Sequence, residues 1–251
     1  MYNITYQQAI EKIASDLGIT ADSKQIPRIA IPANPEAIAD QKKVTVIQCT
    51  TKRFTKLDKE YWNSYHISVD ELKEFEVYSI EDLYINRIKQ QIGKDELVYG
   101  YLFSGNLWKI YRPYSTTDKW RNNLPITMMH GLDRIKDAEI AVVTKSLKDE
   151  ICMKKFIPAI CSVQNESRSS ISKESIEYLQ KNAKVTYVNF DNDTTGVQAC
   201  KHYNSYGFKW LNVPKNIPIV GTDKYIKDIS DWMRYRGPDV VEEYLKHKKI
   251  I

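Results

Sequence analysis

The chain has 251 residues, of which 42% are hydrophobic and 27% are charged. This composition is that of a folded globular protein and argues against an intrinsically disordered chain. No apolar run approaches the roughly 20 residues that a membrane-spanning helix needs, and residues 1–5 lack the pattern of a signal peptide. We therefore expect a cytoplasmic protein without a membrane partner. The net charge of +5 permits a polyanionic partner but does not require one.

The cysteines argue against two kinds of site. Cys49, Cys152, Cys161 and Cys200 are widely spaced and include no Cys-x-x-Cys pair. We therefore expect neither a structural zinc site nor a disulfide framework. The apolar surroundings of the last three predict small core residues.

The first half of the chain mixes helices and strands. Residues 6–17 have the apolar spacing of an amphipathic helix, and residues 44–49 alternate like a strand. Residues 59–77 are expected to be mostly helical. Within them, Ser68 followed by Glu71 three positions later predicts a capping box.

A hairpin is the strongest local signal of the first half. Residues 98–103 and 108–112 alternate between apolar and polar side chains, and Ser-Gly-Asn lies between them. Residues 78–88 are expected to add a further strand. The first half is therefore predicted to be antiparallel and mixed.

From residue 138 the pattern changes to alternating strands and helices. Strands are predicted at residues 140–143, 157–163, 184–190 and 208–213, and helices from residue 148 and at 173–182, 195–206 and 239–247. This alternation predicts a parallel, doubly wound sheet. We expect two domains, a mixed α+β domain of residues 1–137 and a parallel-sheet domain of residues 138–251.

An acidic motif follows the third of these strands. Asp191 and Asp193, one residue apart, come at the carboxyl end of a buried strand, where open α/β sheets bind ligands. Two close carboxylates repel each other unless a cation lies between them, and Mg²⁺ favours such a site together with water and phosphate. The competing interpretation is local, because Asp and Asn also favour turns.

The second half resembles a TOPRIM domain, the metal-binding fold of bacterial-type primases, topoisomerases and some nucleases. Three segments carry the resemblance, in this order: residues 141–149, residues 191–196 (Asp-Asn-Asp-Thr-Thr-Gly) and residues 227–232 (Lys-Asp-Ile-Ser-Asp-Trp).

The first half narrows the resemblance to the catalytic, RNA polymerase domain of bacterial and phage primases. Similar segments are residues 61–73, with a tryptophan helix before an Ile-Ser cap, residues 109–113 with 119–123, and residues 5–19. The resemblance implies an α/β protein, with an α+β N-terminal subdomain followed by a Rossmann-like TOPRIM subdomain. The N-terminal zinc-binding module of such primases is absent from this sequence.

The implied activity is synthesis of short RNA primers on single-stranded DNA by metal-dependent nucleotidyl transfer, with Mg²⁺ or Mn²⁺ as cofactor. Asp191, Asp193 and Asp228 are the candidate metal ligands, and Asp231 is the alternative to Asp228. Asp149 is a further catalytic candidate, either as a ligand or as a first-turn helix charge.

One position departs from the family pattern. Relatives usually have a glutamate at the end of the first TOPRIM strand, where this chain has Lys145. A lysine cannot bind Mg²⁺ as a carboxylate does. Glu166, just past the next strand, is a candidate replacement, and an exposed loop glutamate is the alternative.

Basic residues are the candidate ligands of the nucleotide and the template backbone. They are Lys109, Arg112, Lys119, Arg121, Lys145 and Lys148. Strand alternation places Lys109 and Arg112 on opposite faces, and we favour Lys109 for the cleft. Lys148 either contacts phosphate at a helix N-terminus or belongs to a solvated face. Trp120 is a candidate for base stacking, whereas Trp62 has the spacing of a core residue.

The resemblance implies single-stranded DNA and ribonucleoside triphosphates as partners, with a separate zinc-binding module and a replicative helicase as further candidates. A phage or mobile element is an expected source, which places the protein in the bacterial host cytosol. Two other functions stay open. One is a TOPRIM nuclease that uses the same carboxylates, and the other is a non-catalytic module that binds nucleic acid or a replication partner.

Overall fold

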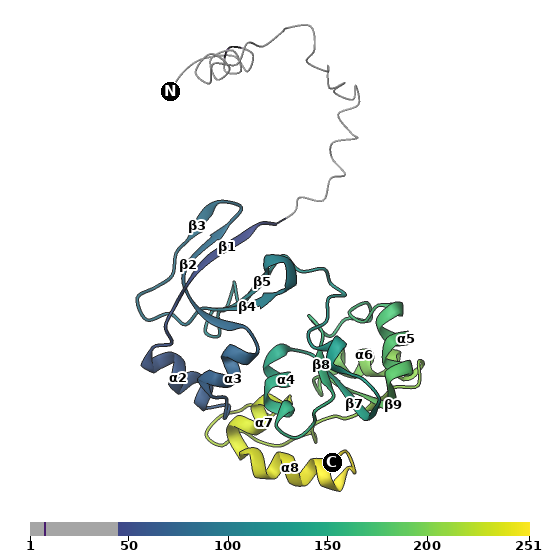
Figure 1. The fold of residues 1–251 in the computed structure, drawn as a ribbon. Helices are drawn as coiled ribbons and strands as arrows, with labels where there is room; N and C mark the ends of the chain where they lie inside the picture. The colour runs from purple at the N-terminus through teal and green to yellow at the C-terminus, as the bar shows by residue number, and fades with distance from the viewer. Residues whose placement is uncertain (1–7, 9–44) are drawn as a thin grey trace, which may run out of the picture. The chain divides into compact units, whose positions relative to one another are not determined.

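Two β-sheets organise the part of the chain that the structure, a computed structural model, describes, namely residue 8 and residues 45–251 (Figure 1). The chain divides into a unit of residues 1–43 and a unit of residues 44–251. Apart from Gln8, which is helical, the helix predicted over residues 6–17 lies outside the described residues. Everything below concerns the second unit.

The first sheet is antiparallel and has the strand order β1-β2-β4-β5-β6, with β3 paired to β2. Its strands are β1 (Ile47–Lys52), β2 (Val77–Ile85), β3 (Ile88–Gln90), β4 (Tyr99–Phe103), β5 (Leu107–Tyr111) and β6 (Trp120–Asn122). The predicted hairpin is confirmed as β4 and β5, in which Tyr101 pairs with Lys109.

Two short helices occupy the stretch predicted to be mostly helical. They are α2 (Lys56–Asn63) and α3 (Val69–Glu74). The predicted capping box is confirmed, since the Ser68 amide donates to Glu71 Oε2 at 2.8 Å and the Glu71 amide donates to Ser68 Oγ at 3.2 Å. This cap starts a second helix, and the left-handed backbone of His66 (φ 57°) separates it from the first.

The second sheet is parallel, as predicted, with the strand order β10-β9-β7-β8. Its strands are β7 (Ala138–Thr144), β8 (Ile160–Ser162), β9 (Ala183–Asn189) and β10 (Lys209–Trp210), and the helices between them are α4 (Leu147–Lys154), α5 (Lys173–Asn182) and α6 (Thr194–Asn204). The chain runs from β7 outward to β8 and then returns past β7 to β9. The strand order therefore reverses between β7 and β9.

Two helices close the chain. The last, α8 (Pro238–His247), is the predicted one, whereas α7 (Ile229–Arg236) falls on a motif for which no helix was predicted. Asp228 is the N-cap of α7 and accepts from the Asp231 amide at 2.6 Å. This arrangement packs α7 against α4.

One hydrophobic core contains side chains from both sheets and from α7, among them Trp62, Tyr99, Val142 and Trp232. Cys152, Cys161 and Cys200 are buried, as predicted. The predicted domain boundary falls at the start of β7, and the division into two domains stays a prediction. Within the described residues, no helix has the length and apolar character needed to cross a membrane.

Candidate active site

The pairing of β7 with β9 brings two charged residues together. Thr144 pairs with Asn189, so the chain leaves the two strands at the same edge of the sheet. Lys145 follows β7 directly, and Asp191 follows β9 by two residues. This edge is the carboxyl end of the parallel strands where the strand order reverses, which is where open α/β sheets bind ligands.

Asn192 ties this loop to the segment before α7. Its amide donates to the Lys227 carbonyl at 3.2 Å, and its side chain donates to the Ile226 carbonyl at 3.3 Å. Asp228, which directly follows Lys227, is the N-cap of α7 and is held there by the start of that helix. The result is that Asp228, which is far from Asp191 in sequence, lies beside the β9 loop.

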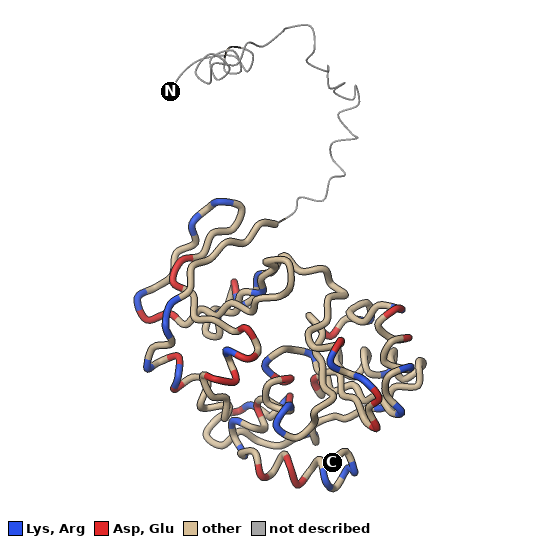
Figure 2. Tube along the Cα trace, in the orientation of Figure 1, with Lys and Arg blue, Asp and Glu red and all other residues tan. Residues whose placement is uncertain are grey.

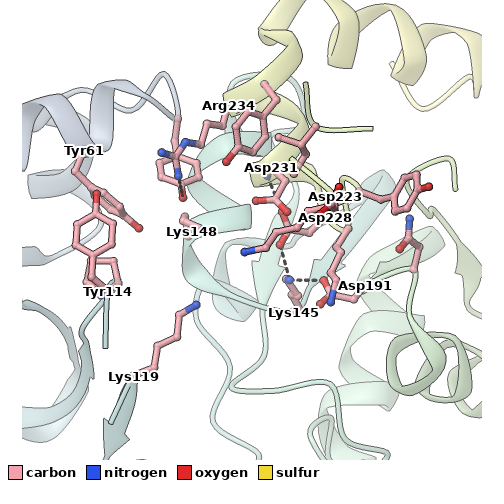
Figure 3. A pocket seen from close by; sticks show the side chains of 18 of the residues that line it. Tyr61, Tyr114, Lys119, Lys145, Lys148, Asp191, Asp223, Asp228, Asp231 and Arg234 are labelled. Carbon is pink, nitrogen blue, oxygen red and sulfur yellow. Dashed lines mark hydrogen bonds and ion pairs between the residues drawn. The ribbon is translucent and has the colours of Figure 1, made fainter. Parts of the chain in front are cut away.

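Lys145 connects the two carboxylates (Figure 3). Its ammonium group donates to Asp191 Oδ1, and to Asp228 Oδ2 at 2.6 Å. The exposed fractions of the three side chains are only 16%, 15% and 13% for Lys145, Asp191 and Asp228. In a site so shielded from water these charges interact strongly.

The carboxyl groups of the cluster differ in pKa, because burial and neighbouring charges act on each of them differently. Burial would raise the pKa of Asp228, but Lys145 and Lys148 hold it well below its usual range. Burial raises the pKa of Asp191 to about 6, and Asp228 adds to this rise against the effect of Lys145. Burial and then Asp228 also raise the pKa of Asp231 to about 6.

Burial acts most strongly on each of these carboxyl groups, and the neighbouring charges then add to its effect or oppose it. Both signs of charge gather along the chain where α4 and α7 meet (Figure 2). Burial opposes the charge of Lys145, yet the nearby carboxylates hold its pKa well above its ordinary value. The carboxylates therefore keep Lys145 charged in spite of its burial.

Asp149 lies beneath this cluster and is fully buried. Its carboxylate accepts from Ser146 Oγ at 2.6 Å and from the Ser230 amide at 3.1 Å. Asp149 therefore joins the first turn of α4 to the first turn of α7, and it lines neither of the cavities described below. Burial, followed by Asp228, raises its pKa.

Asp193 has a different position from Asp191. It is exposed and is the N-cap of α6, where its Oδ1 accepts from the Gly196 amide at 3.1 Å. Asp193 also lines neither cavity. In residues 45–251, no three acidic, histidine or cysteine side chains converge in a way that would hold a metal ion. Of the three candidate ligands, the structure brings only Asp191 and Asp228 together.

Glu166 is a neighbour of Asp191 and is half-buried. Burial and the nearby charge of Asp191 raise its pKa to about 7. The resemblance implies a glutamate at position 145, where this chain has Lys145. The glutamate next to Asp191 is instead Glu166, in the loop after β8.

We expect this raised pKa to make stability depend on pH. The ordinary glutamate value is 4.5, so between pH 4.5 and 7 the folded chain binds a proton that the unfolded chain releases. Stability should therefore fall as pH rises through this window, and Glu166→Gln should remove that part of the fall. At pH 8 the variant should be more stable by about 1 kcal/mol, a value reduced for solvent screening.

Urea unfolding at pH 5 and pH 8 with a chelator present would measure this difference. Glu177→Gln, on the exposed side of α5, is the control for loss of an acidic residue elsewhere. A Glu166→Gln variant with the same pH dependence as the wild type would contradict the assignment.

Two adjoining cavities open over the cluster, with volumes of about 850 Å³ and 450 Å³. The residues that line both are Tyr111, Lys119, Lys145, Lys148, Asp191 and Asp228. Tyr61 and Tyr114 lie across the larger cavity from Asp191 and Asp228 (Figure 3). The space thus has a wall of acidic and basic side chains from the second half of the chain and an aromatic wall from the first half.

Three of the predicted basic residues face these cavities from the first half or from α4. Lys109 is buried, donates to the Gln164 carbonyl at 2.7 Å and lies 4.8 Å from the centre of the Trp120 ring. Burial lowers its pKa to about 8. Lys119 is exposed, and Lys148 lies 4.2 Å over the ring of Tyr65.

The other two basic candidates from the first half point elsewhere. Arg112 pairs with Glu96 at 3.3 Å and donates to the Gln91 carbonyl at 3.0 Å. Arg121 pairs with Asp118. Neither arginine lines the two cavities, so the structure brings Lys109, Lys119, Lys145 and Lys148 together without them.

Sequence reasoning missed part of the cavity wall. Tyr61, Tyr65 and Tyr114 come from segments that the sequence marks as helix or loop, and Arg234 comes from the helix that was not predicted. Arg234 donates to the Tyr65 hydroxyl at 3.0 Å. The sequence signals for this wall were the similarity of residues 61–73 to primases and the count of 17 tyrosines in a basic chain.

Two solved primase fragments have a similar fold. The chain resembles the zinc-binding and RNA polymerase domains of the Aquifex aeolicus primase, with a TM-score of 0.51 and 13% identity over 98% of this chain and 68% of that chain. It also resembles the primase fragment of the bacteriophage T7 primase-helicase protein, with a TM-score of 0.52 and 12% identity over 73% and 72% of the two chains. No protein-family model and no curated protein matches the sequence. The likeness shows a primase-like α/β fold.

Proposed function

We propose that this chain is the catalytic core of a DNA primase, which synthesises short RNA primers on single-stranded DNA. The observation that carries the proposal is the pair of adjoining cavities, in which Asp191 and Asp228 face lysines and tyrosines at the carboxyl edge of a parallel sheet. The similarity of the fold to bacterial and phage primase fragments supports it.

Primer synthesis joins a 3′-hydroxyl group to the α-phosphate of an incoming ribonucleotide and expels pyrophosphate. A divalent ion would supply neutralisation of phosphate charge and alignment of the reacting oxygens. Asp191 and Asp228 would hold it, because their carboxylates line both cavities, and Mg²⁺ commonly takes one or two protein carboxylates together with water and phosphate. Mn²⁺ fits the same donors. Asp193 would serve chiefly to hold the loop that contains Asp191.

The remaining residues of the cavity would bind the nucleotide. Lys119 and Lys148 supply positive charge for the triphosphate, and Lys148 extends from the first turn of α4, where backbone amides favour anions. Tyr114, which is 68% exposed, would supply aromatic surface for a base, while Tyr61 packs edge-on against it and Tyr65 contacts Lys148. A cavity of about 850 Å³ is within the size range of small-molecule sites.

The template would lie along the smaller cavity. The Trp120 ring stacks on Tyr111, with 4.2 Å between ring centres and an interplanar angle of 17°, and it is 39% exposed. Stacking surfaces next to lysines are typical of single-strand binding. Lys109 beneath this ring pair would fix its position, because its ammonium is anchored to the Gln164 carbonyl.

This assignment divides the work between the two predicted domains. Residues 1–137 would contribute template and nucleotide contacts, and residues 138–251 would contribute the TOPRIM-type metal site. One similar structure includes a zinc-binding domain, and another is a fragment of a primase-helicase protein. We therefore propose a separate zinc-binding module and a replicative helicase as partners, in the cytosol of a bacterial or phage-infected cell.

Incorporation of labelled ribonucleotides on single-stranded DNA tests the proposal. With Mg²⁺ or Mn²⁺ the chain should make short RNA products, and a chelator should abolish them. The Asp191→Asn variant, purified in parallel, controls for contaminating polymerases. Metal-dependent loss of the template without products would indicate a nuclease. Neither result, even with a phage-type zinc-binding module added, would favour a non-catalytic module.

A further inference from the structure

Lys145 occupies the place between two carboxylates that a metal ion would take. Its ammonium contacts one oxygen of Asp191 and one oxygen of Asp228, and these two aspartates come from different elements of the fold. The other described lysine that lines both cavities on this side, Lys148, makes its ring contact with Tyr65 instead. Lys145 thus joins the two acidic segments.

The lysine is not locked in this place by its own surroundings. It lines both cavities, so open space lies beside the ammonium group. Its exposed fraction is 16%, and its only hydrogen bonds within residues 45–251 are those to the two aspartates. A four-carbon stem with a terminal ammonium moves readily when a stronger cation takes its partners.

We propose that Lys145 is a resident counter-cation that competes with the divalent ion for Asp191 and Asp228, and that binding of the metal releases its ammonium toward the nucleotide phosphates. This inference rests on the proposed function for the identity of the ligand. It assigns a role to the substitution of lysine for the glutamate of the resembling family. The lysine keeps the two carboxylates paired until metal and nucleotide arrive, and it then becomes a phosphate ligand.

The physical reason is the cost of leaving charges unpaired in a shielded site. Without any cation, Asp191 and Asp228 repel each other at low exposure. With Lys145 in place, a divalent ion must first displace an ammonium that both aspartates bind. The wild-type protein should therefore bind free Mn²⁺ weakly, and removal of the ammonium should strengthen that binding.

The competition between Lys145 and the divalent ion can be tested by Mn²⁺ binding, which is measured from the electron paramagnetic resonance signal of the free ion and needs no activity assay. Lys145→Met should bind Mn²⁺ about tenfold more tightly than the wild type or better, because the competing charge is gone. Lys154→Met is the matched control, since Lys154 lies on α4 and donates to the Pro158 carbonyl, away from the cluster. That control should bind Mn²⁺ as the wild type does.

A second variant, Lys145→Gln, and thermal unfolding of both variants show whether replacing the lysine unfolds the protein. If either Lys145 variant is unstable in chelator, Mn²⁺ should raise its melting temperature more than it raises that of the wild type. Equal Mn²⁺ affinity in wild type and variants, or variants that Mn²⁺ does not stabilise, would overturn the inference. Absence of primer synthesis by the wild type would instead overturn the proposed function. The comparison of Mn²⁺ affinities would still test the role of Lys145.

Discussion

Replacing Asp191 with asparagine is expected to reduce ribonucleotide incorporation by about a hundredfold or more, because one of the two carboxylates proposed to hold the divalent ion would be lost. Asparagine keeps the size of the side chain but cannot balance a divalent ion or the Lys145 ammonium. The fold should persist, since burial already disfavours the charge of Asp191 and raises its pKa to about 6. Initial rates with saturating metal, together with circular dichroism, would measure both effects.

Asp193→Asn is the matched control for this experiment. Asp193 is exposed and caps α6, and asparagine is as good an N-cap as aspartate. Its incorporation rate should stay within about threefold of the wild type, since the cap is preserved. Equal losses in both variants would mean that Asp193 acts directly on the reaction. An active Asp191→Asn variant would place the chemistry outside this cluster.

Gly196→Ala is expected to destabilise the protein by about 2–4 kcal/mol and to reduce incorporation, although alanine is normally the better residue inside a helix. A Cβ atom at this position would lie 2.2 Å from the Asp191 carbonyl oxygen and 2.8 Å from the Asp191 amide nitrogen. Both are backbone atoms, so the loop that carries Asp191 must shift. Urea unfolding measures the stability, and the incorporation assay measures how far the shift of the Asp191 loop reduces the rate.

Gly93→Ala provides the comparison for this variant. A Cβ atom at Gly93 meets nothing closer than 3.6 Å, and its nearest neighbour is a side-chain atom of Glu96. The stability of this variant should change by less than about 1 kcal/mol. If Gly196→Ala is as stable and as active as Gly93→Ala, the close packing of α6 against the Asp191 loop does not position the site.

Local sequence patterns predicted the elements whose signals are strong and short in range. The β4–β5 hairpin, the Ser68–Glu71 capping box and the helices α5 and α8 follow from alternation, caps and apolar spacing. Residues 59–77 were predicted to be mostly helical with a helix capped at Ser68, and the structure has two helices there, separated at His66 by its left-handed backbone. Helix α7 was not predicted, although its N-cap, Asp228, is a residue type that favours this position.

The candidate site was predictable only in part. The strand-end position of Asp191 and the unusual Lys145 are visible in the sequence, and the parallel alternation of elements indicates that both lie at one edge of a sheet. The different roles of Asp191 and Asp193 are not visible, because the direction of each carboxylate depends on which one caps α6. The tyrosine wall and Arg234 depend on packing between distant segments.

The α/β pattern, the parallel sheet of the second half and the acidic motif after β9 can be predicted from the sequence, because they follow from periodicity and from residue types within a few positions. The bridge from Lys145 to Asp191 and Asp228 cannot, since these aspartates lie 46 and 83 positions away in the chain. Contacts of this range depend on strand order and on the loop held by Asn192. No local signal encodes them, since they arise when the segments pack together.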